Sequence, residues 1–160
     1  VISSIAAHFC ISEFEKISPL PIVNIVQTLE AHLARRKLKR VGVLGNRITM
    51  ETKLFGGVSS AEIIVPFGKE LDVVHDEYIK MATTGTVDSR QRELLFTIGK
   101  DLCEKQGVEA VVLAGTDLFL AFDGYDCGFP VIDSALVHIE ALLDMSVQAT
   151  TNKAVLSKNA

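Results

Sequence analysis

Cysteine is scarce in this sequence, and its three copies form no pattern that would build a disulfide framework or a metal centre. Cys10, Cys103 and Cys127 are widely separated, without the Cys-x-x-Cys or Cys/His spacing of zinc sites. Their odd number also argues against a fully paired set of disulfides. We therefore expect three reduced thiols, no bound metal and no cofactor.

Long apolar runs and long runs of one charge are absent as well. No apolar segment reaches the roughly 18 residues that a membrane-spanning helix needs, and no signal-peptide pattern is present. Sixteen basic side chains stand against twenty acidic ones, which leaves no electrostatic footprint for nucleic acid or an anionic membrane. The short basic cluster Arg35–Arg40 is more typical of a helix end, where cations complement the helix dipole. We expect a cytoplasmic protein that binds neither nucleic acid nor membrane.

Apolar residues, by contrast, make up 48% of the 160 residues, enough for a sizeable core in one domain or two small lobes. Short apolar runs alternate with helical patterns along the chain. The predicted strands are Val1–Ala7, Pro21–Ile25, Arg40–Leu44, Glu62–Val65, Glu109–Leu113 and Phe129–Ile132. The predicted helices are His8–Ile17, Thr28–Lys39, Met50–Phe55, Lys69–Met81, Ser89–Gln106 and Asp133–Ser146, and the polar segment Thr150–Ala160 is expected to fray. This alternation predicts an α/β fold with a doubly wound parallel sheet.

Two polar turns follow two of the apolar runs and predict a site. Glu109–Leu113 is typical of a buried strand, and Gly115–Asp117 follows it with small residues. Thr116 or Asp117 is placed to cap a following helix, whose first N–H groups lack internal partners. Gly45–Thr49 forms a similar turn after Arg40–Leu44. The carboxyl ends of parallel strands share one sheet edge, where ligands bind in open α/β sheets, although an ordinary strand-turn-helix corner is the alternative.

Four segments together resemble the aspartate/glutamate racemase family. Arg40–Glu51 resembles its apolar strand followed by Gly-Thr-x-x-Thr-Met, and Val111–Leu118 resembles its Gly-Cys-Thr-Glu segment. Pro130–Ala141 resembles the closing Pro-x-x-Asp-Thr-x-x-x-His motif, and Ser4–His8 occupies the place of Cys-Asn-Thr-x-His. The resemblance covers nearly the whole chain in the right order. It implies a cofactor-independent amino-acid racemase.

The resemblance also implies an arrangement of lobes. Family members have two pseudo-symmetric α/β lobes with the site in the cleft between them, and they commonly form dimers. Residues 25–132 then correspond to the second lobe, while residues 1–24 and 133–160 correspond to the end of the first. We expect most of the first lobe to lie upstream of Val1, and we expect a homodimer.

Racemisation removes an α-proton from one face of the substrate and returns one to the other, which requires two acid/base groups. The family places one cysteine at each strand end, because a thiol pKa near 8.5 can be tuned toward neutrality. Ser4 and Gly115 occupy these two places here. A serine hydroxyl is a weak proton carrier without an adjacent base, which His8 supplies only if the turn folds it back. Glycine carries no proton, so Thr116 would have to replace the second thiol.

The resulting site hypothesis names Ser4 and Thr116 as candidate catalytic residues. The candidate substrate-binding residues are Asn46, Thr49, Gly115, Asp117 and His8, which would bind a small carboxylate or amino-acid ligand with helix N-termini. Helix capping is the alternative for Thr49 and Thr116, and structural packing is the alternative for His138, which matches the family histidine. Three functions stay open: a racemase with altered catalysis, a non-catalytic carboxylate-binding or structural family member, and a related reaction such as decarboxylation.

Overall fold

A four-stranded parallel sheet organises the molecule. The computed structural model describes the backbone of residues 2–158 and the side chains of residues 2–147. The strands are β1 (Arg40–Gly45), β2 (Glu62–Ile64), β3 (Ala110–Ala114) and β4 (Val131–Asp133), in the order β2-β1-β3-β4. All three neighbouring pairs are parallel. The predicted parallel α/β fold, with the runs at 40–44 and 109–113 as interior neighbours, is therefore confirmed.

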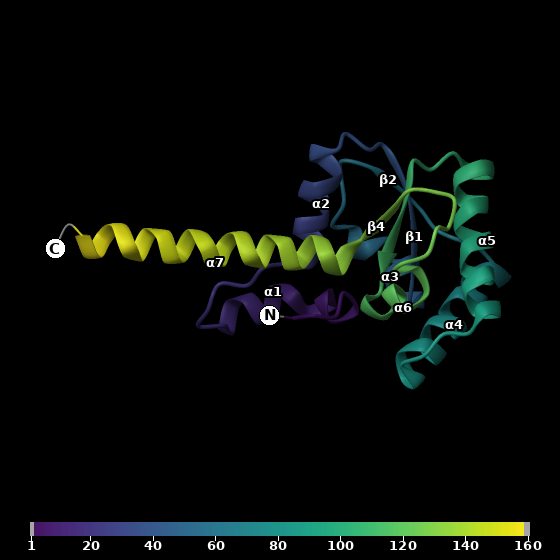
Figure 1. Ribbon diagram of the computed structural model, residues 1–160, viewed down its shortest axis with the longest axis horizontal. Coiled ribbons are helices and arrows are strands. Elements are labelled where there is room, and N and C mark those ends of the chain that lie inside the picture. The colour runs from purple at the N-terminus through teal and green to yellow at the C-terminus, as the bar shows by residue number, and fades with distance from the viewer. Residues whose placement is uncertain (1, 159–160) are drawn as a thin grey trace.

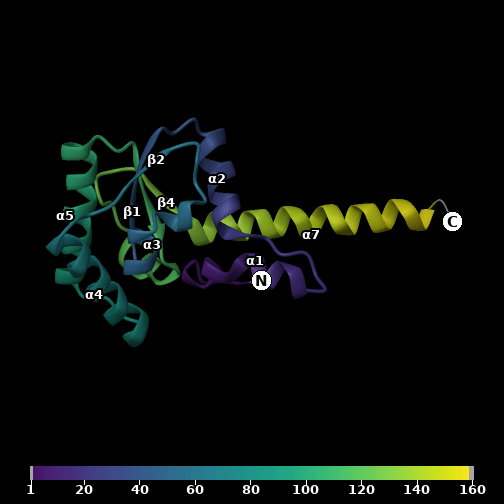
Figure 2. The same cartoon turned by 180° about the vertical axis from the view of Figure 1, so that it is seen from behind.

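Helices cover both faces of this sheet (Figure 1). The long helices are α2 (Ile25–Arg35), α4 (Lys69–Thr84), α5 (Ser89–Gln106) and α7 (Ser134–Lys158). The shorter ones are η1 (Ala6–Cys10), α1 (Ile11–Ile17), α3 (Arg47–Glu51), η2 (Leu54–Gly56), η3 (Thr116–Leu118) and α6 (Phe119–Phe122). Both views place α2 and α7 on one side of the sheet, and α4 and α5 on the other (Figures 1 and 2).

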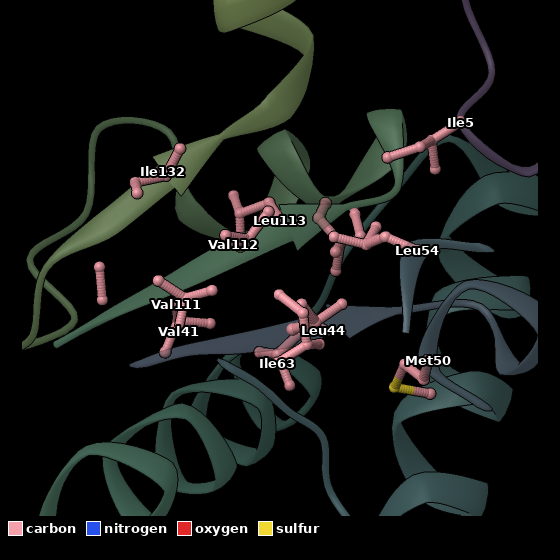
Figure 3. Packing of buried hydrophobic residues seen from close by; sticks show 14 of the residues in the cluster. Ile5, Val41, Leu44, Met50, Leu54, Ile63, Val111, Val112, Leu113 and Ile132 are labelled. Atoms are coloured by element: carbon pink, nitrogen blue, oxygen red, sulfur yellow. The ribbon is translucent and has the colours of Figure 1, made fainter. Parts of the chain in front are cut away.

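The interior strands form the core because their apolar residues are buried on both faces. Every residue of β3 is buried, and β1 is buried from Val41 onward. Figure 3 shows Val41, Leu44 and Val111 packed between the layers. Burial of such side chains stabilises the fold by about 1.5–3 kcal/mol each. Short valine-rich runs therefore become central strands.

Several helix boundaries follow the capping residues in the sequence. Asp88 opens α5 with a capping box, in which its carboxylate accepts from Gln91 N and the Gln91 side chain accepts from Asp88 N. Gly107 ends α5 in the left-handed conformation, with φ 67°. Asp133 Oδ1 accepts from Ala135 N at 2.8 Å at the start of α7. The basic cluster Arg35–Arg40 begins at the carboxyl end of α2, as predicted, but it continues past the helix to Arg40, the first residue of β1.

Two predicted strands near the chain start are wrong. Residues 2–5 are not in a strand and Ala6–Cys10 is a 3-10 helix, while Val1 lies outside the described residues. Pro21–Ile25 has no strand either, because Asn24 caps α2 by accepting from Val26 N and Gln27 N. The Val23 carbonyl pairs with the His138 side chain and not with a neighbouring strand. The apolar side chains of these two runs pack against helices, and side-chain hydrogen bonds take the place of strand pairing.

The predicted end of the last helix is also wrong. α7 continues to Lys158 through most of the segment 150–160 that was expected to fray, and residues 159–160 lie outside the described part. The helix contains neither glycine nor proline, and elongation of an existing helix adds one hydrogen bond per residue fixed. Within the described residues, no helix combines the length and hydropathy required to cross a bilayer.

Candidate functional site

The two polar turns lie on the same edge of the sheet, as the sequence predicts. Gly45 at the end of β1 is the register partner of Ala114 at the end of β3. The Thr49 hydroxyl also lies 3.4 Å from the Ala114 carbonyl oxygen. The carboxyl ends of the two central strands are thus joined at the position where α/β sheets bind ligands.

Asn46 and Thr49 use their polar atoms inside the first turn. Asn46 Oδ1 accepts from Thr49 N at 3.0 Å and caps α3. The buried Thr49 hydroxyl donates to the Asn46 carbonyl at 2.9 Å. His75, which sequence reasoning did not single out, accepts from Arg47 N at 3.1 Å. Asn46 is therefore the cap of α3, whereas Thr49 lies inside the helix and donates to the Asn46 carbonyl, so the capping alternative for Thr49 is wrong.

The Tyr78 side chain of α4 packs against the backbone that follows the carboxyl end of β3. A Cβ atom added to Gly115 would lie 2.3 Å from Tyr78 Cε2, which is far inside contact distance. The Tyr78 hydroxyl donates to Asp117 Oδ2 at 3.2 Å. Burial, followed by the neighbouring Asp117 carboxylate, raises the pKa of Tyr78 to about 12. The ring therefore occupies the space that a side chain at position 115 would need.

The predicted cap on this second turn is wrong. Gly115 is the N-cap of η3, and no side chain caps that helix. Asp117 accepts from Tyr78 and does not turn back to the helix start. Because the N-cap is a glycine, neither Thr116 nor Asp117 lies before the first helical residue, where a cap must be.

Ser4 is exposed, whereas His8 is buried and engaged on both sides of its ring. His8 Nε2 accepts from Ile25 N at 3.2 Å, so the proton is on Nδ1, which donates to the Ser4 carbonyl at 2.9 Å. Burial lowers the pKa of this imidazole, and the neighbouring His138 lowers it further. This hydrogen bond joins His8 to the backbone carbonyl of Ser4, not to the Ser4 hydroxyl. A neutral His8 thus ties η1 to the start of α2.

His138 packs beside His8 in the interior. Its Nε2 donates to the Val23 carbonyl at 2.8 Å, and the two imidazole rings meet edge to face with centroids 6.3 Å apart. Both side chains are almost fully buried. These contacts correspond to the structural alternative for His138, in which it holds the segment before α2 against α7.

A cavity of about 420 Å³ lies between α7 and the η3–α6 segment. Of the predicted site residues, only Thr116 lines it; the others lie elsewhere on the described surface or interior. The remaining lining residues combine apolar walls with hydroxyl and carboxylate groups: Ser3, Phe119, Asp123, Asp133, Ala135, Leu136, His138, Ile139 and Leu142. Ser3 is the neighbour of Ser4, so the cavity lies between the start of the chain and the second turn.

In the described part of the chain the thiols form no disulfide and the potential metal ligands form no metal site. Cys10, Cys103 and Cys127 are all free, as predicted. Among the described residues, no group of three or more His, Cys, Asp and Glu side chains is arranged to hold a metal ion.

The comparison that decides the family is a match over most of the chain. The family model described as Asp/Glu/Hydantoin racemase matches residues 1–142. The chain belongs to this family. No curated protein matches this racemase-family chain by sequence.

Three solved structures share the fold. A putative Asp/Glu racemase from Yersinia pestis aligns with TM-score 0.76 and 23% identity over 89% of this chain and 63% of that one. An aspartate racemase homologue from Pyrococcus horikoshii OT3 aligns with TM-score 0.74 and 23% identity over 90% of this chain and 64% of its own. For the aspartate racemase of Picrophilus torridus the TM-score is 0.67 and the identity 21%, over 87% and 59%. The chain thus spans about 60% of the length of these relatives.

Tyr78, like His75, is a residue at this edge that sequence reasoning missed. It lies on the buried face of α4 with Val74 and Met81, a spacing that indicates only a core-facing helix. Its partner Asp117 is 39 residues away, so no local motif connects the two. The available signal was the glycine at position 115, which leaves room for a large neighbouring side chain.

Proposed function

We propose that this racemase-family chain binds a small amino-acid ligand but has lost the two-thiol route of racemisation. The observation that carries the proposal is the Tyr78 ring packed over Gly115. The sequence resemblance puts Gly115 in the place of the second family cysteine. A phenol with a pKa of about 12 is a poor substitute for a thiol tuned toward neutrality. Ser4 supplies no thiol at the first position.

The cavity beside Thr116 supports an amino acid as ligand. Thr116 lines the cavity, where its hydroxyl can donate to a carboxylate. Ser3 adds a second hydroxyl. Asp123 and Asp133 also line the cavity and would repel a dicarboxylate while attracting an α-ammonium group. This combination favours a zwitterion with an apolar side chain.

We further propose the lobe division and assembly that the family resemblance implies. Residues 25–132 then form the second lobe, and residues 1–24 and 133–160 contribute to the first. The support for a homodimer is the apolar surface on the chain's flanking segments, with Phe9, Ile17 and Leu143 all well exposed. Surfaces of this kind are typical of protein contacts.

Deuterium exchange at the α-carbon, followed by NMR, tests the loss of catalysis. We expect no exchange of aspartate, glutamate or apolar amino acids above background. A positioned acid/base group typically contributes ~10²–10⁴-fold, so two missing groups should leave the reaction very slow. Ser4→Cys with Gly115→Cys should stay inactive because Tyr78 blocks the new side chain. Adding Tyr78→Ala should be required for any gain, and rapid exchange by the native chain would refute the proposal.

Ligand titration by NMR tests the binding half of the proposal. The matched pair is the native chain and Thr116→Val, which keeps the side-chain shape and removes the hydroxyl. Loss of one hydrogen bond to a charged ligand group should weaken binding about 10-fold or more. Absence of binding by the native chain, with its fold verified by circular dichroism, would leave a purely structural role.

A further inference from the structure

The cavity beside Thr116 has two walls that leave the sheet from neighbouring strands. One wall is the η3–α6 segment that follows β3, and the other is the start of α7, which follows β4. The Ser134 hydroxyl donates to the Leu113 carbonyl and fixes the α7 wall to β3. In the described part of the chain no side chain caps η3. The position of Thr116 on that wall therefore depends on contacts with another element.

Tyr78 of α4 contacts the residues on both sides of Thr116. Its ring packs against Gly115, where an added Cβ atom would lie 2.3 Å from Tyr78 Cε2. Its hydroxyl donates to Asp117 Oδ2 at 3.2 Å. Gly115 is the N-cap of the single turn η3, and Asp117 lies inside that turn. One buried side chain thus spans the three residues centred on Thr116.

The hydrogen bond to Asp117 gives η3 a direction that burial alone does not. Leu118 is fully buried, which fixes how deeply the turn lies, but apolar burial is non-directional. A hydrogen bond, by contrast, constrains both a distance and an angle. Burial is the main cause that raises the pKa of Tyr78 to about 12, so its hydroxyl stays protonated and keeps donating throughout the neutral range.

We propose that Tyr78, acting through Asp117, is a positioning residue that holds the Thr116 hydroxyl toward the cavity and so determines how tightly an amino-acid carboxylate binds there. This inference rests on the proposed ligand site, in which Thr116 is the carboxylate donor. Tyr78 then has two roles. Its ring excludes a side chain at position 115, and its hydroxyl fixes the residue that follows.

Titration of the full chain with leucine, followed by NMR, tests the positioning role. Tyr78→Phe keeps the ring and removes only the hydroxyl, and the dissociation constant should rise about 3- to 10-fold. The rise should not exceed that caused by Thr116→Val, because Tyr78 acts through this residue. In a Thr116→Val background, Tyr78→Phe should therefore have little further effect. Equal fold-changes in both backgrounds, or no change in the native background, would overturn the proposal.

Two matched variants separate positioning from a general loss of structure. Tyr125→Phe makes the same chemical change at the other tyrosine, whose ring contacts Arg92, and should leave the affinity for leucine unchanged. Asp117→Asn keeps a side-chain oxygen that can accept from Tyr78 and should retain most of the affinity, whereas Asp117→Ala should resemble Tyr78→Phe. All variants are first matched to the native chain by circular dichroism. Normal binding by Asp117→Ala, or equal losses in the two tyrosine variants, would contradict the proposal.

The NMR signal of the Thr116 methyl group gives a second measurement that needs no ligand. In the free protein we expect Tyr78→Phe to shift this signal and Tyr125→Phe to leave it in place. If the native chain does not bind leucine but this pattern is seen, the proposed ligand site is wrong and the positioning of Thr116 by Tyr78 is supported. An unchanged Thr116 signal in Tyr78→Phe would show that Tyr78 does not position this residue, whether or not leucine binds.

Discussion

Gly115 and Tyr78 depend on each other at the end of β3. The ring lies where a side chain at position 115 would be, and its hydroxyl is held by Asp117. A flexible side chain would move aside at little cost, but a buried ring fixed at its tip cannot. Glycine at position 115 and a large aromatic side chain at position 78 of α4 therefore depend on each other sterically.

This dependence predicts the result of a double-mutant cycle. Gly115→Ala should lower the free energy of unfolding by about 1–3 kcal/mol, because the new methyl group overlaps the Tyr78 ring. In a Tyr78→Ala background the same substitution should cost much less, since the overlap is gone. Urea denaturation of the four proteins measures the coupling. Equal costs in both backgrounds would show that the ring is not the obstacle.

His8 predicts a pH dependence of stability. Burial lowers its pKa below the usual 6.5, and protonation would turn Nε2 from an acceptor into a donor facing Ile25 N. The nearby His138 also lowers the pKa of His8, whereas Glu15 and the Ser4 carbonyl raise it. Because the unfolded chain takes up the proton more readily, this contribution is complete above pH 6.5. It is lost as the pH falls further.

The free energy of unfolding should fall by at most about 1.4 kcal/mol for each pH unit below the usual histidine pKa. His8→Gln is the matched control, because an amide can donate to the Ser4 carbonyl and accept from Ile25 N without titrating near neutrality. The pH dependence of the native chain minus that of the variant isolates His8 from other groups, such as His32. Identical profiles from pH 7.5 to 5 would contradict the assignment of a neutral buried imidazole.

At the scale of single elements, α3 is a short helix that relies on its cap. Asn46→Ala should lower the free energy of unfolding by about 1 kcal/mol, because Thr49 N loses its acceptor. Asn46→Ser keeps a capping oxygen and should cost only a few tenths of that. Thermal denaturation of both variants gives the comparison. If alanine and serine cost the same, Asn46 does not act through the cap.

The elements that could be predicted from sequence are those with a strong local cause. β1 and β3 follow from apolar runs that only a doubly covered strand can bury, and α5 follows from Asp88 and Gly107 at its ends. The run at 21–25 has the same apolar character, but Asn24 and the His138 contact determine its structure. Such a contact spans 115 residues, so no window of sequence contains it.

The candidate site was predicted less well than the fold for the same reason. The shared edge of Gly45 and Gly115 follows from parallel strands, and the structure confirms it. The side chains that contact the residues at that edge come from another element. Tyr78 and His75 both belong to α4, and they bind Asp117 and the Arg47 backbone. Polar residues such as Asn46 could be identified from the sequence. Only the structure shows that the Asn46 side chain caps a helix and does not face a ligand.

For the whole molecule, the distribution of exposed apolar residues is uneven. The 3-10 helix η1, α1, the segment after it and α7 carry a large share of them: Phe9, Phe14, Ile17, Leu20, Leu136, Ile139, Leu143, Met145 and Val147. Figure 1 shows α7 extending well beyond the sheet as a single helix. The central sheet, in contrast, is covered on both faces. We therefore expect the apolar surface of the flanking segments to form the contact between two copies of the chain.

Self-association of the purified chain is the prediction that follows. We expect a dimer by sedimentation equilibrium at micromolar concentration, because burying these side chains on a second copy contributes roughly 1.5–3 kcal/mol for each one fully covered. Leu143→Glu should weaken dimerisation at least about 10-fold, since a carboxylate would be desolvated in the contact. Phe67→Glu, at an apolar position before α4 that is even more exposed than Leu143, is the control and should leave the dimer unchanged. A stable monomer, or equal effects of the two substitutions, would show that the flanking apolar surface does not mediate assembly.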